Sequence, residues 1–412
     1  MTRARWVALA AASAALFLGS WTLLHQLWYR SADEIVDTPG YETYGDSIVA
    51  GRVPYRDFTV EYPPGALLPM LAPELTASRG NFGEYGHSFE KWMAGAGVLM
   101  SLLAAVALAA LRPPPLRAAV AMLLVGASPL LLGNLMLSRF DLWVAALTVG
   151  ALAALLWERD TTSAVVLGAA IATKLFPAVL VPIGLVWVWR RRGRRAAFVW
   201  TALVAAVCAV VFVPFAVLSP GGVGHSFGVQ LERPLQLESL GGAILIALHN
   251  DAGTTLHVFT TVSQNLSGPG AHAAAVLSSA AQVAALLAVW LLYARGPATR
   301  ERLVTYAAAA VVAFVAFGKV LSPQYLVWLI PLVSLVRSRL AQGLLVAALV
   351  LTQIEFPARY WQLANDLKPS IAAVVLARDL VLVALAVLLT APVGFDRGSP
   401  AEQTDARETR AS

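Results

Sequence analysis

The chain has 412 residues, of which 58% are hydrophobic and only 13% are charged, and its formal net charge is +6. A mean hydropathy of +0.69 excludes an ordinary soluble globular domain and is typical of a polytopic membrane protein. The basic excess could indicate a nucleic-acid partner, but the positions of the basic residues, described below, argue against that class.

The N-terminal segment begins with Arg3 and Arg5 and continues as an apolar run from Trp6 to Leu24. This run is longer than a secretory signal and lacks a small-x-small cleavage site, so it predicts a retained signal-anchor helix. The single cysteine, Cys208, lies in a later apolar run, where we expect a small buried hydrophobic residue rather than a disulfide.

Apolar runs of about 17 to 25 residues predict membrane-spanning helices. The segment between the charged cluster 157–160 and the arginine block 190–195 predicts two short helices broken at 174–177, because Pro177 disfavours helix at the residue before it. We expect an all-α polytopic membrane protein with about 12 transmembrane helices (range 10–13). The remaining predicted spans are 6–24, 92–111, 117–133, 141–157, 196–217, 271–293, 303–318, 324–336, 340–356 and 371–392.

The loops divide by charge. With Met1 in the cytoplasm, the predicted inside segments hold 18 of the 30 Lys and Arg residues, so the arginine block 190–195 reads as a topological anchor and not as a nucleic-acid patch. The sequence therefore predicts a multi-pass protein of the cell membrane with both termini cytoplasmic. Residues 1–395 form one integral membrane domain in this interpretation, and 396–412 form a disordered cytoplasmic tail.

Polar residues gather in the predicted outside loops, 25–91 and 218–270. A carboxylate beside a membrane helix can act as a general base toward a sugar hydroxyl, and aromatic rings can stack on sugar faces. The alternative is that the acids only solvate the loop, which is least favoured for Asp37 and Glu61. Residues 51–55 predict a fixed turn, and 65–75 predict a short interfacial or re-entrant helix. The acids and tyrosines of the first loop are Asp33, Glu34, Asp37, Asp46, Asp57, Glu61, Tyr41, Tyr44, Tyr55 and Tyr62.

A second set of candidates is cationic. Lys174 falls inside an apolar segment, where an ionised side chain needs a partner or a wet cavity, so it is a functional candidate. Arg139 and Asp141 flank the start of the next helix upstream. Arg233 and Lys319 lie in outside segments, and cations that converge beside a carboxylate loop would suit a phosphate-linked lipid. The alternative for such residues is snorkelling to the membrane interface.

Four ordered motifs resemble those of one family. The motifs are 37–64 (from Asp37-Thr-Pro-Gly-Tyr41 to Glu61-Tyr-Pro-Pro64), Lys174-Leu-Phe-Pro177, Arg233-Pro-Leu-Gln-Leu-Glu-Ser239 and Leu321-Ser-Pro-Gln-Tyr325. Together they resemble the actinobacterial polyprenyl-phosphomannose-dependent alpha-mannosyltransferases, glycosyltransferase-C enzymes of the family 87 type. The resemblance implies a glycosyltransferase-C-like helix bundle that uses no cofactor and no metal. It also implies a hexosyltransferase that moves a hexose, by default mannose, with inversion from a polyprenyl-phosphate donor to a glycolipid or polysaccharide acceptor, outside the cytoplasm.

The resemblance also implies residue roles. Asp37 matches the catalytic base, with Asp33 and Glu34 as alternative bases. Lys174, Arg233 and Lys319 would stabilise the phosphate of the leaving group. We expect Tyr41, Tyr55, Glu61 and Glu238 to position the sugar or the loop.

Two other classes stay open. A transporter or flippase of lipid-linked sugars would also place a lysine and broken helices in the membrane, although we find no convincing internal repeat. A structural scaffold would not need Lys174 within an apolar segment.

Overall fold

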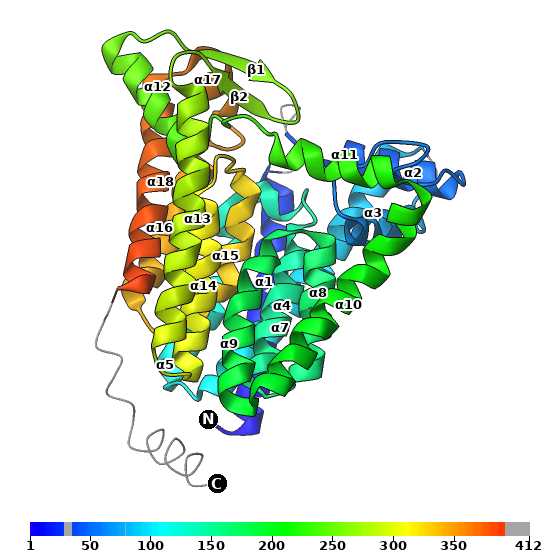
Figure 1. Ribbon diagram of the computed structural model, residues 1–412, viewed down its shortest axis with the longest axis vertical. Coiled ribbons are helices and arrows are strands. Elements are labelled where there is room, and N and C mark those ends of the chain that lie inside the picture. Colours follow the sequence, from blue (N-terminus) through cyan, green and yellow to red (C-terminus); the bar gives the residue numbers. More distant parts are fainter. Residues whose placement is uncertain (29–34, 79, 392–412) are drawn as a thin grey trace.

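The computed structural model describes residues 1–28, 35–78 and 80–391. Its longest helices run side by side along the long axis of the molecule, and shorter elements cover one end (Figure 1). The predicted tail 396–412 and the alternative bases Asp33 and Glu34 lie outside the described residues. In chain order the elements are α1 (Arg3–Trp28), α2 (Thr38–Val49), η1 (Pro64–Ala66), α3 (Leu67–Glu74), α4 (Phe82–Leu111), α5 (Pro115–Gly126), α6 (Ser128–Leu132), η2 (Gly133–Met136), α7 (Asp141–Leu156), α8 (Asp160–Thr173), η3 (Phe176–Leu180), α9 (Val181–Arg192), α10 (Arg194–Leu218), α11 (Pro220–Leu231), α12 (Leu240–Ala252), β1 (His257–Thr260), β2 (Gln264–Ser267), α13 (Ala271–Arg295), α14 (Arg300–Phe317), η4 (Pro323–Tyr325), α15 (Leu326–Leu335), α16 (Arg339–Glu355), α17 (Tyr360–Asp366) and α18 (Pro369–Thr390).

Every predicted span coincides with a helix or with a pair of broken helices. The all-α membrane class is therefore confirmed. Within the described residues, five helices are long and apolar enough to cross a membrane, and the number rises to seven if each of two bent helix pairs counts as one span. The others are too short or too charged at their ends to qualify by length and composition, so the number of about 12 stays a prediction.

The helix break predicted at 174–177 is present. α8 ends at Thr173, Lys174 is extended, and a 3-10 turn, η3, begins at Phe176 before α9. Pro177 agrees with the break, because it lacks the N–H group that a continuing α-helix would donate to the carbonyl of Thr173. The short apolar piece near 65–75 likewise folds as η1 and α3, as expected for a short helix in the first loop.

The basic loops meet at one end of the bundle, the end at which the N-terminus lies in Figure 1. Arg117, in the first turn of α5, forms an ion pair with Glu301 at the start of α14. Glu158 pairs with Arg191, and Arg300 reaches the same carboxylate at 3.5 Å. The segments that the charge pattern assigned to the inside are thus neighbours in space, although the side of the membrane on which they lie stays a prediction.

Two long helices, α10 and α13, bury few of their apolar side chains. About three-quarters of the surface of each of three α10 residues is exposed: Phe198, Val210 and Val217. Leu277 on α13 is 68% exposed. Apolar side chains that point away from the protein along a whole helix face are expected where lipid is the solvent. These two helices therefore form lipid-facing walls of the bundle.

The opposite end of the bundle is covered by polar loops and short helices. α11 lies across the ends of the long helices beside α2 and α3, while the hairpin of β1 and β2 lies with α12 and α17 over α13, α16 and α18 (Figure 1). The two strands are antiparallel and pair His257 with Ser267. Neither α2 nor this hairpin follows from the apolar pattern of the sequence.

Candidate active site

Asp37 stands at the N-terminal boundary of α2. Pro39 lies in the first turn of this helix, where a residue without an N–H group is tolerated, and the backbone carbonyl of Asp37 accepts from the amides of Gly40 and Tyr41. Its side chain does not cap the helix. Instead, Oδ2 lies 2.8 Å from Nε of Arg139 and accepts a 3.2 Å hydrogen bond from the hydroxyl of Tyr41. The Asp37 side chain is about one-third exposed, so a substrate could reach it.

Arg139 is held almost fully buried in the segment between η2 and α7. Its Nη2 donates to the carbonyl of Ile35, and its Nη1 donates to the carbonyl and hydroxyl of Ser138. The guanidinium therefore bridges the start of the first loop to the start of α7. This bridge fixes the position of the Asp37 carboxylate and leaves its Oδ1 without a hydrogen bond from the described residues.

A second ion pair lies two residues further on. Asp141 begins α7 and is fully buried, and its Oδ1 accepts from Nζ of Lys174 at 2.6 Å. The same oxygen accepts from Nε1 of Trp328 at 2.5 Å. The helix break after Thr173 places Lys174 in this pair, because an extended residue there turns its side chain out of the α8 register. The carboxylate is the partner that a lysine in an apolar segment requires.

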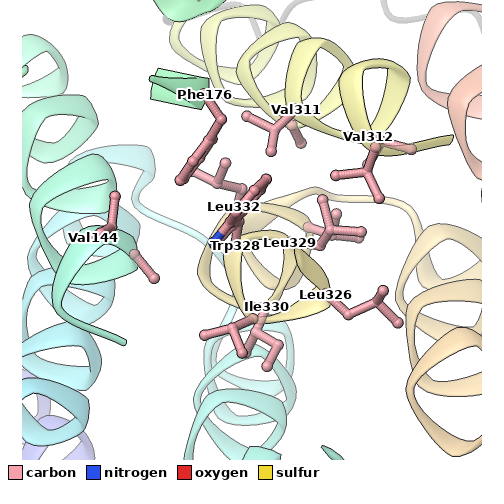
Figure 2. Close-up of a cluster of buried hydrophobic side chains, with 14 of the residues drawn as sticks. Val144, Phe176, Val311, Val312, Leu326, Trp328, Leu329, Ile330 and Leu332 are labelled. Carbon is pink, nitrogen blue, oxygen red and sulfur yellow. The ribbon is translucent and has the colours of Figure 1, made fainter. Parts of the chain in front are cut away.

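Aromatic rings surround the Lys174 ammonium. Its Nζ lies 4.8 Å from the centre of the Phe140 ring, 5.1 Å from that of Trp328 and 5.8 Å from that of Tyr325. Trp328 is itself stacked on Phe176 with ring centres 3.8 Å apart, and Figure 2 shows these two rings face to face among apolar side chains of α7, α14 and α15. Cation–π contacts of this kind stabilise a cation that has lost much of its water.

The two ion pairs are neighbours because Arg139, Phe140 and Asp141 are consecutive. Tyr41 and Tyr62 pack edge-on against Phe140, with ring centres 5.5 and 5.2 Å away. Burial is the largest cause that raises the pKa of the Tyr41 hydroxyl well above its ordinary value, and the charge on Asp37 adds to it. Burial and then the charge on Asp37 raise the pKa of Tyr62 in the same way. Both tyrosines therefore stay neutral and can donate hydrogen bonds.

Glu61 joins this group to two further cations. Burial raises the pKa of the Glu61 carboxyl, Arg233 nearby lowers it, and the charge on Asp37 raises it again. Lys319 donates from Nζ to the carbonyl of Leu231, and its own pKa is lowered by burial and then by Arg233. Arg233 donates to Oγ of Ser263. Within the described part of the chain, neither Arg233 nor Lys319 has a carboxylate within ion-pair distance, so both can receive an anion.

Tyr55 holds the first loop against the membrane helices. Its hydroxyl donates to the carbonyl of Tyr62, and its own carbonyl accepts from Oγ of Ser219. The backbone of Gly222 lies so close that a Cβ there would be 2.0 Å from the Tyr55 carbonyl oxygen, so only glycine fits. These contacts favour loop positioning over sugar contact as the role of Tyr55.

A mostly apolar cavity lies beside Tyr55 and Glu61. It has room for about one water molecule and is lined by side chains of the first loop, of α10 and of α11, together with Leu175. Leu175 directly follows Lys174. The cavity is therefore adjacent both to the carboxylate of Glu61 and to the helix break.

Glu238 lies in a different environment, in what we call the buried charge cluster, formed by Glu238, Glu355, Arg378 and Asp379. Arg378 of α18 donates to the Glu238 carbonyl at 2.6 Å and to Oδ1 of Asp379 at 2.9 Å, and all four side chains are almost fully buried. The Glu355 carboxyl lies beside that of Glu238 in this cluster. In the described part of the chain, Glu238 contacts this cluster and makes no contact with Asp37. The geometry therefore gives no support to the expected role of Glu238 in positioning the sugar.

Seven of the predicted site residues thus fall into one connected group: Asp37, Tyr41, Tyr55, Glu61, Lys174, Arg233 and Lys319. The sequence interpretation did not assign site roles to Arg139, Phe140, Asp141, Tyr62, Tyr325 or Trp328. A signal existed for Arg139 and Asp141, two opposite charges two residues apart at the start of a predicted helix. No sequence signal connected Trp328 to them.

A carboxylate, two buried tyrosines and several cations thus lie together in the helix bundle. The profile of Glycosyltransferase family 87 matches residues 58–323, which is more than half of the chain, and the chain belongs to this family. The family prediction is confirmed, and the protein is a membrane glycosyltransferase. The matched range contains Glu61, Lys174, Arg233 and Lys319, while Asp37 precedes it.

Among curated proteins, none matches the chain. Among solved structures, the chain is similar to ArnT from Cupriavidus metallidurans in the apo state, with a TM-score of 0.47 and 18% sequence identity, over 94% of this chain and 77% of that chain.

Proposed function

We propose that this protein transfers a hexose, by default mannose, from a polyprenyl-phosphate donor to a glycolipid or lipoglycan acceptor on the extracytoplasmic face of the cell membrane. The observation that carries the proposal is the placement of the Asp37 carboxylate, with Oδ1 open, in one group with the cations Lys174, Arg233 and Lys319. A carboxylate can activate an acceptor hydroxyl, and cations can neutralise a departing phosphate.

The proposed reaction inverts the anomeric carbon and needs no metal. An acceptor hydroxyl gives its proton to Asp37 while its oxygen forms a bond to C1 of the donor sugar. The bond between C1 and the phosphate oxygen breaks, and the electron pair leaves with polyprenyl phosphate. Asp37 takes up the proton of the acceptor hydroxyl. No general acid is needed, because a phosphate monoester is already a good leaving group at neutral pH.

The cations divide into two kinds in this proposal. Arg233 and Lys319 have no carboxylate partner among the described residues and are the first candidates to hold the donor phosphate. Lys174 is already paired with Asp141 and would have to share its charge between that carboxylate and the phosphate. The small apolar cavity beside Leu175 and Glu61 marks the side from which the proposed lipid-linked substrate would approach.

The test is transfer of radiolabelled mannose from polyprenyl-phosphomannose to membrane acceptors by the full chain in reconstituted vesicles. General-base catalysis contributes roughly 100- to 10,000-fold, so Asp37→Asn should lose at least about 100-fold in turnover. Asp46→Asn, on the same helix α2, is the matched control and should stay active.

Each outcome has a meaning. Full activity of a folded Asp37→Asn protein would remove Asp37 as the base and direct the test to Asp33 and Glu34. Absence of transfer by the wild type with several lipid-linked sugars, together with movement of such a lipid between leaflets, would favour the transporter or flippase class instead.

A further inference from the structure

Three potential metal ligands, none of them assigned a role in the candidate active site, lie together on α1 and α4. His25 is in the last turns of α1, and His87 and Glu90 are three residues apart in the first turns of α4, so the latter two lie on one helix face. One ligand atom from each of the three residues lies within 4.8 Å of the other two. We call these residues the His-His-Glu group.

The distances suit a small divalent transition-metal ion. Zn²⁺ binds histidine nitrogen at about 2.0–2.1 Å and carboxylate oxygen at about 2.0–2.2 Å, and in tetrahedral geometry two such ligand atoms are roughly 3.4 Å apart. Nε2 of His25 and Oε2 of Glu90 are 3.0 Å apart, close to this value. The His87 nitrogen, which lies within 4.8 Å of the other two ligand atoms, can move closer by side-chain rotation, because His87 is the most exposed of the three residues.

The chemistry of the ligands agrees with the distances. Imidazole nitrogen suits zinc, copper, iron and nickel, and a set of two histidines and one glutamate is an established zinc set that leaves a fourth position for water. The two imidazole rings already lie near each other, with ring centres 6.2 Å apart, and Trp21 packs beside His25 at 5.8 Å. The His25 ring is thus partly fixed before any ion binds.

We propose that His25, His87 and Glu90 form a binding site for a divalent transition-metal ion of the Zn²⁺ class. The site has a structural role in this proposal and takes no part in sugar transfer. α1 leads into the first loop and α4 leads out of it, so one ion would fasten together the two ends of the loop that carries Asp37. This inference does not depend on the identity of the donor or of the acceptor.

A simpler arrangement uses the same short contact. A hydrogen bond between His25 and Glu90 accounts for the 3.0 Å distance, but it does not require His87. His87 is therefore the residue that separates the two explanations. Because it is exposed, its replacement by alanine should leave the fold intact.

The experiment uses the full chain, purified in detergent, with any affinity tag removed and with metal stripped by a chelator. Zn²⁺ is titrated by calorimetry, and Co²⁺ is added as a spectroscopic probe whose visible absorption reports nitrogen and oxygen ligation. The wild type should bind one equivalent with a Co²⁺ spectrum, whereas His87→Ala and Glu90→Gln should lose both. His272→Ala, an exposed histidine at the start of α13, should keep both.

Thermal unfolding provides a second readout. A ligand that binds only the folded state raises the melting temperature, so Zn²⁺ should raise it for the wild type and for His272→Ala but not for His87→Ala. Equal binding and equal shifts in the wild type and in His87→Ala would overturn the proposal and leave only the His25–Glu90 hydrogen bond. Because the readouts are binding and melting, a failure here is distinct from a failure of the proposed transfer reaction.

Discussion

Lys174 and Asp141 form an ion pair that joins the break between α8 and α9 to the first residue of α7, with 2.6 Å between Nζ and Oδ1. The pair is almost fully removed from solvent, and Trp328 donates to the same oxygen. Removal of either partner would leave an uncompensated charge, so the two residues must act together.

This coupling predicts a non-additive mutant cycle. Lys174→Met should reduce turnover by roughly 100-fold, the effect of removing one group that stabilises developing negative charge, and Asp141→Asn should do about as much. The double variant should be no worse than the worse single variant, because residues in one ion pair are not independent. Turnover is measured with reconstituted protein, and the control is Lys368→Met, at an exposed lysine whose Nζ donates to Gln362. Additive losses would contradict the coupling.

The lowered pKa of Lys319 predicts an alkaline limb in donor binding. Burial and then Arg233 lower this pKa, so Lys319 loses its charge at a pH below its ordinary value of 10.5. If its charge holds the donor phosphate, the KM for donor should rise as the pH rises through the lowered pKa. Lys319→Met should lack this limb. Arg233→Met should move the limb to higher pH, because removal of the like charge lets the pKa of Lys319 return toward 10.5.

The same shift has the opposite sign for stability. A lysine whose pKa is depressed in the folded state disfavours the fold while it is charged, and this effect disappears as the pH rises from the folded pKa to the unfolded one. As the pH rises from the folded pKa of Lys319 to its unfolded pKa, donor binding should therefore weaken while the destabilising effect of Lys319 on the fold is lost. If the melting temperature falls over the same pH range in which the KM for donor rises, general unfolding explains the rise in KM, and this assignment is refuted.

Gly65 predicts a steric effect on the site. A Cβ at this position would lie 2.6 Å from the carbonyl oxygen of Ala172, just before the break that carries Lys174. Gly65→Ala should therefore displace the end of α8, and a misplacement of about 1 Å can reduce turnover by roughly 100-fold. Gly95→Ala has no neighbour within 4 Å and should be neutral. Equal activity of the two variants would show that the close approach of the first loop to α8 is not required.

The buried charge cluster predicts a large effect on stability. Arg378 is the one cation among the four side chains, so Arg378→Met would leave three buried acids without it and should destabilise the protein by roughly 3–5 kcal/mol. Thermal unfolding in detergent is the measurement, and Arg359→Met, at an exposed arginine before α17, is the control. A second substitution, Glu238→Gln, should restore part of the loss, and a failure to do so would argue against charge balance as the cause.

The helical framework follows from the sequence because lipid imposes a simple rule. Every apolar run must satisfy its backbone polar groups internally, so each run predicts a helix, and Pro177 predicts the break at Lys174. α2 was not predicted because its sequence carries no long apolar run, although Pro39 is well suited to the first helical turn that it occupies. The hairpin of β1 and β2 was missed because it is short and polar.

The site was predictable in its residue types and less so in its pairings. Composition and the motifs singled out Asp37 and Lys174, but the partner of each is more than 30 residues away and is chosen by the packing of helices. The expected role of Glu238 failed to find support for the same reason, since Arg378 of α18 reaches it from 140 residues further on. Local sequence carries no information about such contacts.

The adjacent charges Arg378 and Asp379 have a consequence for how the protein is made. They lie in the middle of α18, and each charged residue at the centre of a helix adds roughly 2.5–3.5 kcal/mol to the free energy of its insertion into a bilayer. The partner residues Glu238 and Glu355 belong to segments synthesised earlier. α18 should therefore enter the membrane most readily alongside α12 and α16 that are already in place, which makes the final helix of the described chain a checkpoint for complete biogenesis.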